Sequence, residues 1–148
     1  MFKGLNIASG GMSAQRARLH VISSNIANAS TTRTEDGGPY KRQEAVFRTT
    51  LPEGWAEAMK DGAPKGADVD LSLRGVEISE VQEDNVPGPI VFDPGHPDAD
   101  ENGNVELPNV NPVEEMVDMI AASRSFEANA QSFQTLRDMI TRAMDIGR

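Results

Sequence analysis

A candidate metal-binding segment in this 148-residue chain is the acidic turn from Asp98 to Gly103. Its sequence, Asp-Ala-Asp-Glu-Asn-Gly, matches the opening of an EF-hand loop, in which alternate side chains bind one calcium ion and the glycine allows a sharp bend. The twelfth position counted from Asp98 is Asn109 instead of a glutamate, and nearby prolines exclude flanking helices. We therefore interpret the segment as a solvated acidic turn and predict no metal site.

Catalytic residue types are present but have no supporting pattern. His20 and His96 lie in different elements, with no cysteine or paired carboxylate at ligand spacing. Hydroxyls such as Ser9, Ser13 and Ser125 lie outside any nucleophile motif, and no glycine-rich phosphate loop is present. The sequence therefore predicts that the chain is not an enzyme and has no cofactor or small-molecule substrate.

Two amides are the more informative polar residues. Asn25 and Asn28 are three residues apart on one helical face, beside the apolar positions Ile22 and Ile26. Buried amides need hydrogen-bond partners, so amides beside an apolar stripe would fix the register between helices. Alternatively, Asn28 with the serine and threonines that follow it simply ends the helix. Both interpretations can hold together.

The segment that carries these amides has the apolar repeat of a helix that packs lengthwise on other helices. We expect a helix from Phe2 to Asn28, about 40 Å long at 1.5 Å per residue. Only Gln15 interrupts the repeat. Candidate assembly residues on this helix are Leu5, Met12, Leu19, Ile22, Asn25, Ile26 and Asn28.

A second helix is predicted to begin at Asn111-Pro112, with asparagine as the N-cap and proline at the first helical position. An apolar residue recurs every seven positions, and others fill most of the positions between, except Ser123 and Arg137. The candidate assembly residues are Met116, Met119, Phe126, Ala130, Phe133, Ile140 and Met144. The two terminal stripes can pair with each other.

The helical period disappears between residues 37 and 107, where turn residues predominate. Alternating residues predict strands in Val69–Ser79, Glu44–Thr49, Pro89–Phe92 and Asn104–Leu107. We interpret residues 51–68 as a loop that contains the single tryptophan, Trp55. The predicted fold class is α+β: residues 1–36 and 108–148 form a discontinuous, coiled-coil-like helical domain, and residues 37–107 form an inserted β-rich module.

Composition excludes several classes of protein. Residues 1–34 carry four basic and no acidic side chains, too few and too scattered for nucleic-acid binding, whereas residues 35–107 carry seventeen acidic side chains against six basic ones. No apolar run is long enough to predict membrane insertion. The first twenty residues lack the apolar block of a cleaved secretory signal, so we expect a cytosolic chain or one exported without such a signal.

Two motifs resemble those of a known family. Gly11-Met12-Ser13-Ala14-Gln15 and the segment from Ser24 to Thr32 resemble the N-terminal signature of bacterial flagellar rod and hook proteins. Three further segments, residues 37–40, 93–104 and 108–116, are similar to the proximal rod members of that family.

The resemblance implies a structural subunit of the flagellar basal-body rod, the shaft that crosses the periplasm and transmits torque to the hook and filament. It implies export by the flagellar type III apparatus without a cleaved signal, and terminal helices that pack with other rod proteins and with copies of the chain. The residues alone leave open a cytosolic coiled-coil adaptor, whose helices would pair within a stable dimer.

Overall fold

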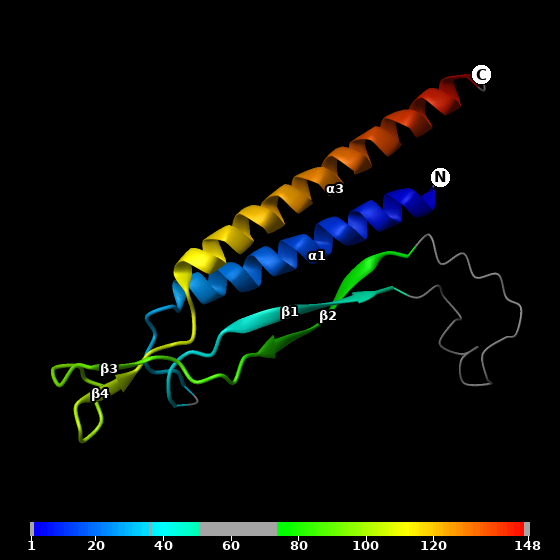
Figure 1. The fold of residues 1–148 in the computed structure, drawn as a ribbon. Coiled ribbons are helices and arrows are strands. Elements are labelled where there is room, and N and C mark those ends of the chain that lie inside the picture. Colours follow the sequence, from blue (N-terminus) through cyan, green and yellow to red (C-terminus); the bar gives the residue numbers. More distant parts are fainter. Residues whose placement is uncertain (1, 36, 51–73, 147–148) are drawn as a thin grey trace, which may run out of the picture.

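The computed structural model describes residues 2–35, 37–50 and 74–146. In chain order the elements are α1 (Phe2–Ala27), β1 (Gln43–Thr49), β2 (Val76–Glu83), β3 (Ile90–Phe92), β4 (Asn104–Glu106) and α3 (Pro112–Ile146). The two helices are antiparallel, and α1 lies between α3 and the β1–β2 hairpin (Figure 1). The predicted α+β class is confirmed.

Hydrogen bonds of nearby asparagine side chains set the end of α1 and the start of α3. We call this end of the helix pair, where the chain leaves α1 and enters α3, the joined end. The Nδ2 atom of Asn28 donates to the carbonyl of Ser24 at 2.9 Å, and its Oδ1 atom accepts from the Thr31 hydroxyl at 3.2 Å, so Asn28 ends α1 as expected. The Oδ1 atom of Asn111 accepts from the amide of Val113 at 3.1 Å, which makes it the N-cap of α3. Both ends lie within one residue of their predicted positions.

Three contacts define the register between the helices. A Cβ atom added to Gly4 would lie 3.3 Å from Leu136, and one added to Gly11 would lie 2.9 Å from the Asn129 amide. Asn25 donates to Glu115 at 3.1 Å. In each pair the two residue numbers have the same sum, so all three contacts belong to one antiparallel register. Gly4 and Gly11 have no side chain, so the two helices can approach each other closely there.

The β1–β2 hairpin packs along α1. The two strands are antiparallel, and the pairing shifts after Val46, where the hydroxyl of Ser79 donates to the Val46 carbonyl at 3.2 Å. The hairpin approaches α1 closely at Gly10, where an added Cβ atom would lie 3.3 Å from the carbonyl oxygen of Val76. The guanidinium of Arg18 lies 6.0 Å from the ring centroid of Phe47.

Strands β3 and β4 form a separate two-stranded ribbon near the joined ends of the helices (Figure 1). The ribbon depends on Gly88, where an added Cβ atom would overlap the carbonyl oxygen of Leu107. It also depends on Gly103, whose φ of 80° favours glycine. Val105 of β4 is buried, whereas Ile90 and Phe92 of β3 are exposed.

The strand predictions near residues 44–49, 89–92 and 104–107 are confirmed to within one residue at each end. β2 runs to Glu83, four residues past the predicted end at Ser79, because pairing with β1 continues through residues whose side chains are mostly polar and all exposed. Val69, Leu71, Leu73, Trp55 and the predicted 51–68 loop lie outside the described residues. Neither described helix has a stretch apolar enough to span a membrane.

Candidate assembly interface

The face of α3 that packs on α1 follows from the register contacts. Steps of four and three residues, starting at Glu115 and passing through Asn129 and Leu136, place the following residues toward α1: Glu115, Met119, Ala122, Phe126, Asn129, Phe133, Leu136 and Ile140. Ala122, in the middle of this series, has no exposed surface. Met119, Phe126 and Phe133 from the predicted assembly set therefore face α1, and Ile140 lies on the same side of α3 but past Phe2, where α1 begins.

The other predicted residues of α3 are Met116, Ala130 and Met144. Met116 and Ala130 follow the inward-facing Glu115 and Asn129, and Met144 continues the same stripe past the start of α1. On α1, the residues one position after inward-facing ones are Leu5, Met12, Leu19 and Ile26. One residue rotates a helix by about 100°. Because the two helices are antiparallel, a residue that follows an inward-facing residue points to the same side of the helix pair, whichever helix it belongs to. We call the surface they form the open face: Leu5, Met12, Leu19, Ile26, Met116, Ala130 and Met144.

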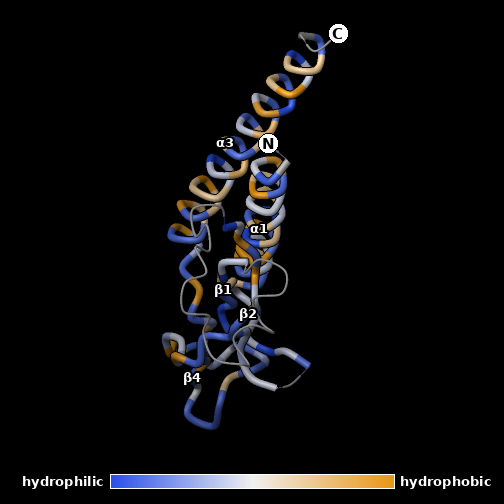
Figure 2. The backbone as a smooth tube through the Cα atoms, turned by 90° about the vertical axis from the view of Figure 1, so that its right-hand side faces the viewer, coloured by the Kyte–Doolittle hydropathy of each residue, from blue (hydrophilic) through white to orange (hydrophobic). Residues whose placement is uncertain are grey.

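Gly10, which contacts the hairpin, comes one position before the inward-facing Gly11, whereas the open-face residues come one position after inward-facing residues. The open face therefore lies on the side of α1 away from the hairpin. Its four α1 members and Ala130 are only half-buried, while Met116 and Met144 are 53% and 71% exposed. Figure 2 shows hydrophobic segments recurring along both helices, including the part of α3 that extends past the start of α1. Ser123 and Arg137 interrupt this face on α3. Apolar side chains that recur along both helices and stay partly exposed are nevertheless typical of an interaction site.

The core of the described residues contains few large side chains. Its buried apolar residues are mostly small: Ala8, Ala14, Val21, Ile22 and Ala122 on the helices and Val105 in β4. Ile22, from the predicted set, is therefore a core residue, whereas larger apolar side chains on α3 and the ribbon remain exposed. The described part of the chain therefore leaves many of its large apolar side chains exposed.

A polar cluster fixes the joined end of the helix pair. Asn25 is 1% exposed and makes four hydrogen bonds. Its Nδ2 atom donates to the Gln43 carbonyl at 2.8 Å and to Glu115 at 3.1 Å. Its Oδ1 atom accepts from the Gln43 amide at 2.9 Å and from the Tyr40 hydroxyl at 3.0 Å. One amide thus connects α1, the start of β1 and the first turn of α3.

Glu115 is the buried charge of this cluster, with 1% of its surface exposed. Its Oε1 atom accepts from Nε of Arg42 at 2.7 Å. Burial of the Arg42 guanidinium opposes its charge, but the hydrogen bond and the negative charges of Glu115, Glu44 and Asp118 outweigh burial and raise the pKa of Arg42. Arg42 therefore stays charged and compensates the buried carboxylate.

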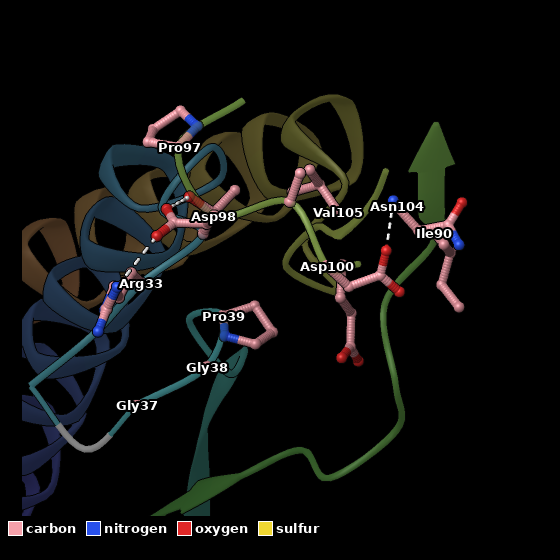
Figure 3. Close-up of a pocket in the computed structure, with 13 residues that line it drawn as sticks. Arg33, Gly37, Gly38, Pro39, Ile90, Pro97, Asp98, Asp100, Asn104 and Val105 are labelled. Carbon is pink, nitrogen blue, oxygen red and sulfur yellow. Dashed lines mark hydrogen bonds and ion pairs between the residues drawn. The ribbon is translucent and has the colours of Figure 1, made fainter. Parts of the chain in front are cut away.

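A hollow of about 560 Å³ lies between the segment after α1 and the β3–β4 ribbon (Figure 3). Two of its carboxylates already have partners. Asp98 accepts from the Thr32 hydroxyl at 2.8 Å and lies 3.5 Å from Arg33. Asp100 accepts from the amides of Asn102 and Asn104 at 2.9 and 2.7 Å. The residues described as lining it include no histidine, serine or lysine that could act as a base or nucleophile.

The acidic turn is a hydrogen-bonded turn in this structure. The amide of Asn104 first, and then that of Asn102, stabilise the charged form of Asp100 and lower its pKa. The carboxylate of Asp100 thus holds the turn, since it accepts from two backbone amides of the same turn. Within the described parts of the chain, no three His, Asp or Glu side chains are grouped to hold a metal ion. His20 is exposed on α1.

Sequence reasoning identified Asn25 but missed its partners Glu115, Gln43 and Tyr40, and it missed Arg42, which bonds Glu115. The hydrophobic pattern assigned Met116 to the apolar stripe of α3 and gave no role to Glu115, the residue before it. One signal was available: Gly4, Gly11, Arg18 and Asn25 recur every seven residues, and none of them is a large apolar residue. Such a spacing marks the positions where α3 comes closest.

The chain is similar to known proteins over both helices and the segment between them. Two family models match, "Flagella basal body rod protein" over residues 5–33 and "Flagellar basal body rod FlgEFG protein C-terminal" over residues 101–146. The flagellar basal-body rod protein FlgC of Borreliella burgdorferi is 44% identical over 152 residues, covering 99% of this chain and 97% of the relative.

Two further FlgC proteins match over nearly their full length. That of Bacillus subtilis is 34% identical, covering 99% of this chain and 98% of the relative. That of Salmonella typhimurium is 35% identical, covering 97% and 95%. Both family models fall on the terminal segments that form the helix pair and the residues next to it. The chain belongs to the family of FlgC flagellar basal-body rod proteins.

Proposed function

We propose that this chain, a structural subunit of the flagellar basal-body rod, joins neighbouring subunits through the open face and transmits torque through the helix pair. The observation that carries the proposal is the open face itself, an apolar surface along both helices that the described residues of the chain leave partly uncovered. Helices that interlock over such a length resist sliding, since shear would displace many side chains at once.

The polar cluster supports the mechanical part of this proposal. Asn25 and Glu115 hold the two helices in one register, and Arg42 and Gln43 attach the β-module to the same point. We infer that residues 1–36 and 108–148 form the assembly domain and that residues 37–107 form a module inserted into it. The position of the cluster, where the chain leaves and re-enters the helix pair, favours this division.

We propose other rod proteins and further copies of this chain as partners in the rod, and the flagellar type III apparatus as the export route. The proposed location is the periplasmic part of the basal body, reached without cleavage of a signal. A cytosolic coiled-coil adaptor is disfavoured by the full-length similarity to FlgC proteins. The structural role of the family also favours a chain that is not an enzyme.

The test is peptide mass spectrometry of purified hook–basal bodies from cells that carry variants of this chain. Met12→Glu and Leu19→Glu place a charge on the open face, and Ser13→Glu and His20→Glu place the same charge on the neighbouring exposed positions. We expect the first pair to reduce rod occupancy and swimming at least tenfold and the second pair to leave both unchanged. Normal occupancy with both open-face variants would refute the proposed interface.

The same spectra test the export proposal. An intact N-terminal peptide in purified basal bodies is the expected result, and a truncated one would show processing. Thermal unfolding of each purified variant separates loss of assembly from loss of folding, because a half-buried charge also destabilises the monomer.

A further inference from the structure

The β3–β4 ribbon has one edge without hydrogen-bond partners among the described residues. At its ends the carbonyl of Pro89 accepts from the amide of Leu107 at 3.0 Å, and the amide of Asp93 donates to the carbonyl of Gly103 at 2.9 Å. Along an antiparallel pair, residues whose backbone groups point to the partner strand alternate with residues whose groups point away. The N–H and C=O groups of the first and last residues of β3 therefore point away from β4. We call this side of β3 the free edge.

The free edge is exposed, whereas the opposite edge of the ribbon is partly occupied. The free-edge residues Ile90 and Phe92 have side chains that are 70% and 69% exposed. On β4, the amide of Asn104 donates to the carboxylate of Asp100 at 2.7 Å, and the carbonyl of Asn104 accepts from the amide of Asp100 at 2.9 Å (Figure 3). An exposed strand edge with unpaired backbone groups is a template for another strand.

The ribbon and the segments next to it are acidic. Residues 84–110 contain no lysine or arginine and six carboxylates: Asp84, Asp93, Asp98, Asp100, Glu101 and Glu106. Asp98 lies 3.5 Å from Arg33, but the other five make no ion pair with a lysine or arginine of the described residues. Glu106 lies opposite Ile90, and Asp93 directly follows Phe92, so an uncompensated carboxylate lies near each end of β3.

These properties define the chemistry of a partner. Unpaired backbone groups require an extended segment, and alternate side chains of such a segment would lie beside Ile90 and Phe92. The exposed side chains favour apolar residues at those positions, and the uncompensated carboxylates favour lysine or arginine at others. Pairing of two free edges from two copies would bring two acidic ribbons together, and like-charge repulsion opposes that arrangement.

We propose that the free edge of β3 binds an extended, basic segment of a different protein, which adds a third strand to the ribbon. The inference goes beyond the proposed function, because it uses no residue of the open face. A three-residue strand is only about 10 Å long, so the contact buries well under the roughly 1,000 Å² that a stable interface needs. It therefore supplements a larger contact between the two proteins.

An NMR titration of the full, isotope-labelled chain tests the contact. The probe is a capped peptide of alternating lysine and valine. One control peptide replaces lysine with glutamate, and the other keeps lysine but carries methyl groups on alternate backbone nitrogens, which removes the donors that strand pairing needs. We expect the probe to shift the amide signals of Ile90 and Phe92, and to bind at least tenfold more tightly than either control.

Two variants of the chain locate the binding. Ile90→Pro removes an outward donor but no bond between β3 and β4, so it should weaken binding at least tenfold while hydrogen exchange of the Val105 amide stays unchanged. Glu106→Gln removes one carboxylate beside β3 and should weaken binding at least threefold. Glu80→Gln makes the same charge change at an exposed position of β2 and should leave the affinity within twofold.

Each outcome decides the point. Shifts at Ile90 and Phe92 that require both lysine and unmethylated backbone nitrogens support strand addition. Equal binding of the methylated peptide would reduce the contact to charge attraction, and equal binding of the glutamate peptide would remove the charge preference. Either result overturns the proposal, as does the absence of shifts on β3. Shifts that appear without peptide as the chain is concentrated would show pairing of two copies instead. Failure here leaves the open face intact, since rod occupancy tests that surface separately.

Discussion

The Nδ2 atom of Asn25 near the end of α1 donates to the carboxylate of Glu115 in the first turn of α3, at 3.1 Å and across 90 positions of sequence. Both side chains are 1% exposed, so water does not satisfy them. Because Asn25 also bonds both backbone groups of Gln43, this pair fixes the register of the helices and the start of the β-module together.

Replacing Asn25 should therefore cost far more than replacing Asn28. Asn25→Leu leaves the Gln43 amide and carbonyl and part of Glu115 without partners, and each buried unsatisfied group costs about 1–3 kcal/mol. We expect the free energy of unfolding in urea to fall by about 3 kcal/mol. Asn28→Leu, the matched control at the helix end, should cost less than about 1 kcal/mol. Equal losses would refute a register role for Asn25.

The buried ion pair should show strong energetic coupling. Arg42→Gln and Glu115→Gln should each destabilise the chain by about 3 kcal/mol, since either leaves the other group poorly compensated. The double variant should be more stable than the sum of the single losses predicts, by at least about 1.5 kcal/mol. The exposed pair Arg48 and Glu77, at 2.9 Å, is the control cycle and should give less than about 1 kcal/mol.

The closely packed helix pair should reject a larger side chain at Ala122. This residue has no exposed surface, so Ala122→Leu should push the helices apart and cost about 1–3 kcal/mol. Ala121→Leu adds the same atoms at the exposed neighbouring position and should change stability by less than about 0.5 kcal/mol. Thermal unfolding of both variants provides the comparison. A melting temperature that is lower for Ala121→Leu than for Ala122→Leu would contradict the assigned register.

The β3–β4 ribbon should depend on Gly88. An added Cβ atom would overlap the backbone carbonyl of Leu107, which cannot rotate away, so Gly88→Ala should disrupt the ribbon. In Gly95→Ala the nearest atom lies at 3.5 Å, an ordinary contact, so the same substitution should be tolerated there. Hydrogen exchange of the Val91 and Val105 amides, on paired strands, measures the effect. Unchanged protection in the Gly88 variant would show that the backbone can adjust.

The acidic turn should titrate below the ordinary range of an aspartate. Two backbone amides lower the pKa of Asp100 beneath its usual 3.8. A depressed folded-state pKa stabilises the turn above pH 3.8, and that contribution is lost as the pH falls through the lower folded-state pKa. An NMR titration should show Asn102 and Asn104 amide shifts with a midpoint below 3.8, absent in Asp100→Asn. A midpoint at or above 3.8 would contradict the hydrogen-bonded turn.

Much of the secondary structure could be predicted because its determinants are local. Asn111-Pro112 begins α3 since the N-cap and the proline act within a few residues, and Asn28 ends α1 for a similar reason. The second half of β2 could not be predicted in this way. Its polar residues adopt a strand because β1 supplies their hydrogen-bond partners.

The candidate interface was predicted only as a set of apolar positions. Spacing alone identified Met116, Phe126 and their counterparts on α1, but it could not divide them between the inner side of the helix pair and its open face. Met116 and Phe126 share a stripe in the sequence, yet only Phe126 faces α1 in the structure. The division depends on the rotation of α3 about its axis.

The sequence by itself determined two long helices with apolar stripes, a β-rich insertion, and amides at the end of the first helix, because periodicity and capping act over neighbouring residues. Only the tertiary structure decided that Glu115, a carboxylate, faces the partner helix instead of Met116. A buried charge is tolerated there because Arg42 and Asn25 compensate it from 73 and 90 positions away, and no local pattern encodes that proximity.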